Sequence, residues 1–151
     1  MEQLIFDSGV KEYRINDGGA LRFNPSDPNL YTRFMGAMEA IKGVQSDLAA
    51  KAETLAPGAD PQDRGAAVLS LMWEADRRIK EILTEVFGSG NDFDAILGGV
   101  NLLAVASNGQ RVIVNLLNAL QPVLVEGAER YAQQQVDAAV EQAKARRGQA
   151  L

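Results

Sequence analysis

Three pairs of closely spaced carboxylates are the residues of this sequence most able to do chemistry. They are Asp60 with Asp63, Glu74 with Asp76, and Asp92 with Asp94. Such pairs can act as general acid and base or hold an oxygen-ligated cation. Glu74 and Asp76 are two positions apart in a predicted helix and face different ways. The other two pairs stand at predicted helix starts, where acidic side chains favour the helix dipole. We therefore interpret the pairs as helix caps or solvated side chains.

Asp76 differs from the other carboxylates because it falls on a predicted apolar stripe, between Trp73 and Ile79. A buried carboxylate needs a partner. Lys80, one helical turn later, is the expected partner, with Arg77 and Arg78 near it. We interpret Asp76 as half of a structural ion pair at the helix edge rather than as a reactive group.

Other chemical motifs fail on spacing. A calcium loop opening at Asp92 would need Gly at Leu97 and a bidentate Glu at Leu103. The glycines of Gly88-Ser89-Gly90 lack the Gly-Lys-Ser/Thr ending of a phosphate loop and do not follow a strand. The basic cluster within Lys144–Arg147 suits a helix C-terminus better than a nucleic acid.

Composition excludes whole classes of site. The 151 residues include 0 Cys and 0 His, which excludes a disulfide framework, a Cys/His zinc site and hydrolases with a Ser–His or Cys–His pair. The net charge of -5 disfavours nucleic acid and anionic membranes as partners. We expect no enzyme activity, no cofactor and no metal. No signal peptide or apolar run of about 20 residues is visible, so a soluble intracellular protein is expected.

The first 25 residues predict a small antiparallel β-meander of two or three short strands. Its predicted strands are the apolar run Leu4–Phe6 and two segments in which apolar and charged residues alternate, Val10–Ile15 and Leu21–Phe23. Its turns are Asp7-Ser8-Gly9 and Asp17-Gly18-Gly19. Glycine accepts a positive φ without strain, which suits the second turn. Pro25 ends the last strand.

Two long amphipathic helices are predicted next. Asp27-Pro28 and Asp60-Pro61 are start signals, while Pro57-Gly58 and Gly88 are end signals. Each helix would be about 40 Å long at 1.5 Å per residue, and the short connection predicts an antiparallel pair. Trp73 is expected in the core of the second helix.

The segment after Gly88 is predicted to be helical in three pieces. A short helix around Phe93–Leu97 would be capped by Asn91 or Asp92, and Val100–Ala106 would be a buried helix, although its β-branched residues leave a strand open. Ser107–Gln110 resembles a capping box for a last helix beginning near Gly109. Pro122 should kink that helix.

The last helix is too long for the domain. From Gly109 to Arg147 it would span about 55–60 Å, whereas a compact domain of this size is about 38 Å across. Either its last turns overhang, or Pro122 turns the helix back onto the core. We favour the overhang, and expect the segment after Gly127 to serve association.

Candidate partner-binding residues lie off the main apolar stripes. They are Tyr31 and Met35 on the first long helix, and Tyr131, Val136 and Val140 on the last. The predicted fold is a single mainly α domain over residues 1–151. It comprises a β-meander (1–25), a helical core (27–127) forming a bundle, and an extended helical tail (128–151).

A resemblance to a known family rests on three segments. A short β-meander leads through Leu21-Arg22-Phe23-Asn24-Pro25 and Asp27 into a long helix, Ile82–Gly88 closes the second helix, and Val100–Leu124 forms a third apolar block. These features resemble the tail assembly chaperones of long-tailed bacteriophages that infect Gram-positive hosts. The resemblance covers roughly residues 5 to 125, and the Ala/Gln-rich end from Gln133 has no counterpart in it.

The resemblance implies a role in binding rather than catalysis. Such chaperones bind the long tape measure protein and keep it soluble in the host cell cytoplasm until tail tube subunits polymerise around it. The expected partners are therefore the tape measure protein, the major tail tube protein and a second copy of the chain. The chaperone would be absent from the mature virion. The alternative is a structural or connector subunit of the virion, which would be found in purified particles.

Overall fold

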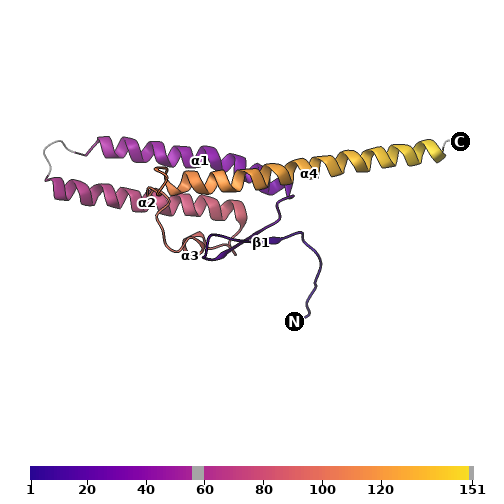
Figure 1. The fold of residues 1–151 in the computed structure, drawn as a ribbon, viewed down its shortest axis with the longest axis horizontal. Helices are drawn as coiled ribbons and strands as arrows, with labels where there is room; N and C mark the ends of the chain where they lie inside the picture. Colours follow the sequence, from indigo (N-terminus) through magenta and orange to yellow (C-terminus); the bar gives the residue numbers. More distant parts are fainter. Residues whose placement is uncertain (56–59, 150–151) are drawn as a thin grey trace.

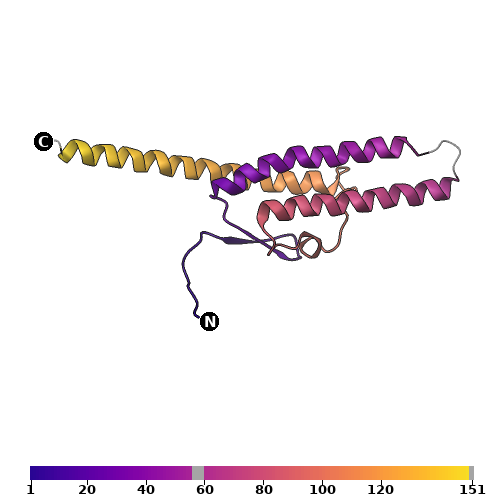
Figure 2. The same ribbon diagram turned by 180° about the vertical axis from the view of Figure 1, so that it is seen from behind.

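The computed structural model describes residues 1–55 and 60–149, and is mainly helical with a small antiparallel hairpin (Figure 1). The chain order is β1 (Lys11–Arg14), β2 (Ala20–Phe23), α1 (Pro28–Glu53), α2 (Pro61–Phe87), α3 (Phe93–Ile96) and α4 (Val112–Gln149). Helix α1 packs along both α2 and α4, while the hairpin and α3 lie against one side of the helices (Figures 1 and 2). The predicted fold class is confirmed.

The N-terminal sheet has two strands among the described residues, so a third strand at Leu4–Phe6 is wrong. The turn between β1 and β2 is where the sequence predicts it, but for a different reason. Asn16, at φ 51°, takes the left-handed conformation. Gly18 and Gly19 are instead needed for a close approach, since a Cβ on Gly19 would lie 3.0 Å from the Cα of Ile96 in α3.

The two long helices begin at their Asp-Pro signals. The Asp27 carboxylate accepts a hydrogen bond from the Asn29 amide, and Asp60 does the same for Gln62. Helix α1 ends at Glu53 with Thr54 as its C-cap, whereas the predicted stop signal Pro57-Gly58 lies outside the described residues. Helix α2 ends at Phe87 with Gly88 as its C-cap, as predicted.

The antiparallel arrangement of α1 and α2 is fixed by packing and by one polar contact. Arg33, near the start of α1, donates from Nε to the carbonyl of Val86 at the end of α2, at 3.0 Å. A row of aromatic rings joins this end of the pair to the hairpin and α3. Successive ring centroids are 4.7, 5.1 and 5.6 Å apart along Tyr13, Phe23, Phe87 and Phe93.

The prediction of a helix at Val100–Ala106 is wrong. The segment forms turns, with one isolated bridge from Val105 to Arg111. Gly98 and Gly99 take positive φ before it, and the side-chain oxygen Oδ1 of Asn101 accepts a hydrogen bond from the Leu103 amide at 2.8 Å, which forms a local turn in place of a helix. Leu102 and Leu103 are nevertheless buried, as the apolar run indicates.

The predicted capping box at Ser107–Gln110 is also wrong. The Asn108 side chain accepts from the Gln110 amide within a turn, and helix α4 begins at Val112. The start of α4 is held instead by the preceding loop, because Ile113 donates its amide to the carbonyl of Leu102 at 2.8 Å.

Helix α4 runs unbroken through Pro122 and extends past the other helices (Figure 1). Its 38 residues span about 57 Å at 1.5 Å per residue. Pro122 and Asn118 are both exposed, so the Asn118 carbonyl that loses its helical donor can be solvated. The predicted overhang is therefore confirmed, and the alternative in which Pro122 turns the helix back is wrong.

Gly127 lies where α4 leaves the bundle. A Cβ at this buried position would overlap the backbone carbonyl of Pro25, which precedes α1. Glycine at this position therefore lets α4 pass against the Pro25 backbone.

We expect Gly127→Ala to lower the free energy of unfolding by about 1–3 kcal/mol, because the backbone of residues 24–26 must move to make room. Gly36 and Gly43 in α1 have open space around their Cα atoms. Alanine at either position should instead stabilise by about 0.4–1 kcal/mol. Chemical denaturation of the three variants checks this, and equal effects at positions 127 and 36 would contradict the close approach.

Candidate functional site

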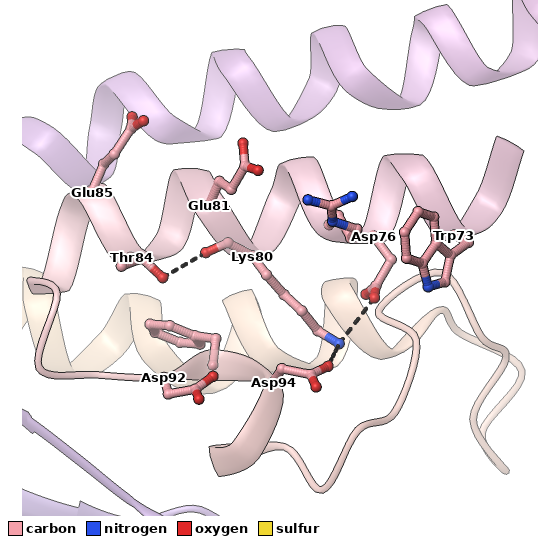
Figure 3. Close-up of a pocket in the computed structure, with 10 residues that line it drawn as sticks. Trp73, Asp76, Lys80, Glu81, Thr84, Glu85, Asp92 and Asp94 are labelled. Atoms are coloured by element: carbon pink, nitrogen blue, oxygen red, sulfur yellow. Dashed lines mark hydrogen bonds and ion pairs between the residues drawn. The ribbon is translucent and has the colours of Figure 1, made fainter.

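A cavity lined largely by charged side chains lies between α2 and α3 (Figure 3). It has a volume of about 650 Å³. Its lining residues come from one face of α2 and from the start of α3: Trp73, Asp76, Arg77, Lys80, Glu81, Thr84, Glu85, Asp92, Phe93 and Asp94. Of the three carboxylate pairs singled out in the sequence, Asp92 and Asp94 therefore both line this cavity, and the pair Glu74 and Asp76 contributes Asp76.

The Lys80 ammonium group lies between Asp76 and Asp94 in the wall of this cavity (Figure 3). Its Nζ lies 2.9 Å from a carboxylate oxygen of Asp76 and 2.6 Å from one of Asp94, and it donates to the Val100 carbonyl at 2.9 Å. The second oxygen of Asp76 accepts from the Leu102 amide at 2.7 Å. The predicted Asp76–Lys80 ion pair is confirmed, and both side chains are 9% exposed.

The electrostatics of the cluster keep Lys80 protonated. Burial alone would lower the pKa of Lys80, because it disfavours the charged form. The hydrogen bonds that Lys80 donates to Asp94 and Asp76, together with the negative charges of these carboxylates, outweigh that penalty and raise the pKa of Lys80 above its ordinary value of 10.5. A protonated amine whose three N–H donors have three acceptors within 2.9 Å has no lone pair for nucleophilic attack.

Two other carboxylates of the three pairs are helix N-caps, as the sequence predicts. Asp92, rather than Asn91, is the N-cap of α3 and accepts from the Ala95 amide, and Asp60 caps α2. Asp94 does more than predicted, since it binds Lys80 as well as standing in the first turn of α3. Within residues 1–55 and 60–149, no group of three or more acidic side chains could hold a metal ion.

The prediction that Trp73 lies in the core is wrong, because its side chain is 56% exposed. Trp73 and Leu69, one turn earlier, lie on the flank of α2 that also carries Lys80 and Phe87. The loop and α3 cover that flank at Lys80 and Phe87 but leave Leu69 66% exposed. The Arg77 guanidinium lies over the indole, 4.8 Å from its centroid.

The five predicted partner-binding residues lie in different environments. In α1, Tyr31 is half-buried and Met35 is 45% exposed. In α4, Val136 and Val140 are 55% and 44% exposed and share one face. Tyr131 is half-buried and, nine residues before Val140, projects from the opposite side of the helix. The structure therefore separates Tyr131 from the two valines.

Asn91 is a buried polar residue whose contacts the sequence does not indicate. Its side-chain oxygen accepts from the Arg22 amide, and its nitrogen donates to the carbonyls of Arg22 and Phe87, all at 2.9 Å. The amide thus pairs with the outer edge of β2 as a neighbouring strand would, and ties the hairpin to the end of α2. The partners are 69 residues apart in sequence, so only the fold could reveal the contact.

Comparisons with known proteins do not assign the chain to a family. No protein-family model matches the chain, and neither the curated proteins nor the solved structures give a match. No helix in the described part of the chain is long and apolar enough to cross a membrane.

We expect Asp76→Ala to lower the free energy of unfolding by about 3–5 kcal/mol, because it removes one carboxylate from a buried ammonium and leaves the Leu102 amide unpaired. Glu81→Ala is the matched control on the same helix, since it removes an exposed pair with Arg78. It should cost less than about 1 kcal/mol. Urea unfolding of both variants measures the difference, and a small effect at Asp76 would exclude the structural role.

We also expect stability to fall as pH rises above 10.5, through the raised pKa of Lys80. In that range the folded chain binds the lysine proton more tightly than the unfolded chain, so the slope of unfolding free energy against pH is negative. Lys80→Gln should flatten this slope, whereas Lys42→Gln, at an exposed position of α1, should leave it unchanged. Equal slopes for the wild type and Lys80→Gln would contradict the pKa shift.

Proposed function

We propose that this protein is a tail assembly chaperone that binds the tape measure protein and keeps it soluble until the tail tube polymerises around it. The observation that carries the proposal is the overhang of α4, which presents a helix face to solvent beyond the bundle (Figure 2). Every residue from Ala132 to Gly148 is exposed. The resemblance of residues 5 to 125 to this family supplies the identity of the partner.

The overhang carries an apolar stripe that suits a helical partner. Helical geometry places the residues of this stripe within one third of the circumference of α4. They are Ala128, Ala132, Val136, Ala139, Val140 and Ala143. Alanines permit two helices to approach closely, while the valines supply apolar contact. An isolated helix of about 20 residues is marginal in water, so a partner along this stripe would stabilise it.

The net charge of -5 supports the same role. A tape measure protein is a long helix with apolar stripes, and it would aggregate if left bare. A bound acidic protein would cover part of the stripe and add charge that keeps the complex soluble.

The test is to co-express a tape measure fragment with the double variant Val136→Asp/Val140→Asp and to measure the soluble fraction of the fragment. We expect a loss of solubilisation with a melting temperature within a few degrees of the wild type. Ala138→Asp/Ala145→Asp adds the same charge on the opposite face of α4 and is the matched control. It should leave solubilisation intact.

Truncation after Gly127 should give the same result as the valine variant, because it removes the whole overhang. Full solubilisation by the truncated chain would overturn the proposal. If the protein were instead recovered in purified virions, the alternative of a structural or connector subunit would replace it.

A further inference from the structure

The first ten residues form an extended arm that projects from the body (Figures 1 and 2). Its centre is an apolar triplet, Leu4, Ile5 and Phe6, whose residues are 92%, 85% and 80% exposed. Ile and Phe favour strands, so the triplet is suited to adding to a sheet edge.

Hydrogen bonds at the base of the arm fix the direction in which the arm leaves the hairpin. Asn24 donates from Nδ2 to the Ser8 carbonyl at 3.1 Å, and the Gly9 amide donates to Asp7 at 2.8 Å. Gly9 has φ +75°, and a Cβ there would lie 2.6 Å from the Asn24 nitrogen. This turn directs the apolar triplet away from the chain's own hairpin.

A receiving site for such a triplet exists on the same chain. Within the described residues, strand β1 pairs only with β2, so its outer edge is unpaired. Beside it, between the hairpin and α4, lies a largely apolar groove of about 490 Å³. Its walls include Tyr13, Ile15, Leu116, Ala119, Leu120 and Val123.

We propose that the arm of one copy adds to β1 of a second copy and places Leu4 and Phe6 in the groove, in a reciprocal two-fold exchange. Alternate residues of a strand face the same side, so Leu4 and Phe6 enter together while Ile5 faces outward. Charge favours this occupant. Glu2 and Asp7 stand on either side of the triplet, and β1 carries Lys11 and Arg14 at its two ends. The acidic residue of β1, Glu12, forms an ion pair with Arg22 at 3.5 Å.

The proposal does not depend on what the α4 overhang binds. Residues 1–6, which precede the turn at Asp7–Gly9, extend about 20 Å, so the exchange brings the hairpins of the two copies close together. Two identical exchanges related by a two-fold axis would close the assembly as a dimer.

The test is sedimentation equilibrium of the full chain over a range of concentrations. We expect a concentration-dependent dimer whose Kd rises about 100-fold or more in Leu4→Asp/Phe6→Asp. Gln3→Asp/Ser8→Asp adds two charges to the same arm but keeps the triplet, and should retain the dimer. Ala119→Trp fills the groove and should also abolish it. Circular dichroism verifies the helical content of that variant, and Ala119→Gln replaces it if the larger side chain unfolds the chain.

A mixture of the two defective variants separates exchange from other modes of association. The arm of the Ala119→Trp chain can still enter the open groove of the Leu4→Asp/Phe6→Asp chain, so a heterodimer should form although neither variant dimerises alone. A monomeric wild type, a dimer that survives the loss of the triplet, or a mixture without heterodimer would each overturn the proposal. An arm protected from protease in a monomer would show instead that it folds onto its own chain.

Discussion

The contacts of Lys80 and Asp76 connect the first half of the fold to the second. Lys80 holds Asp94 in α3 and the carbonyl of Val100, while Asp76 accepts the amide of Leu102. In the loop positioned in this way, the Leu102 carbonyl accepts a hydrogen bond from the Ile113 amide. This bond sets where α4 begins. An ion pair within α2 thus helps to fix the first turn of α4.

An ionic cluster has a different effect here from an apolar contact. A buried pair adds little net stability, because the loss of hydration offsets most of its attraction. Its directional contacts, however, admit only one placement of the loop: three donors of Lys80 and two oxygens of Asp76 are matched to specific acceptors and donors. No buried side-chain polar atom among the described residues lacks a hydrogen-bond partner. The cluster therefore determines the path of a loop that has no regular secondary structure of its own.

The features predictable from sequence are those with local causes. Asp-Pro at the helix starts and Gly88 at a helix end act within one turn of their own position, and the Asp76–Lys80 pair is likewise one turn long. Trp73 could not be placed because periodicity defines a stripe but not how far a neighbour covers it. Val100–Ala106 could not be assigned because its conformation depends on hydrogen bonds with residues far away in the sequence, such as the bond from the Leu102 amide to Asp76 in α2. Asn91 is the extreme case, since its partner strand is 69 residues away.

The four residues Asn24–Asp27 link the two segments that leave the body. Asn24 holds the base of the N-terminal arm through the Ser8 carbonyl, Pro25 packs its backbone against Gly127 where α4 departs, and Asp27 caps α1. The Asn24 side chain also accepts from the Ser26 amide at 2.8 Å, which fixes the turn internally. The base of the arm and the point where α4 leaves the bundle therefore meet at one short stretch of backbone. A displacement of that stretch would reorient the arm and move the Pro25 backbone relative to Gly127, while α4 would keep the direction set by its buried residues in the bundle.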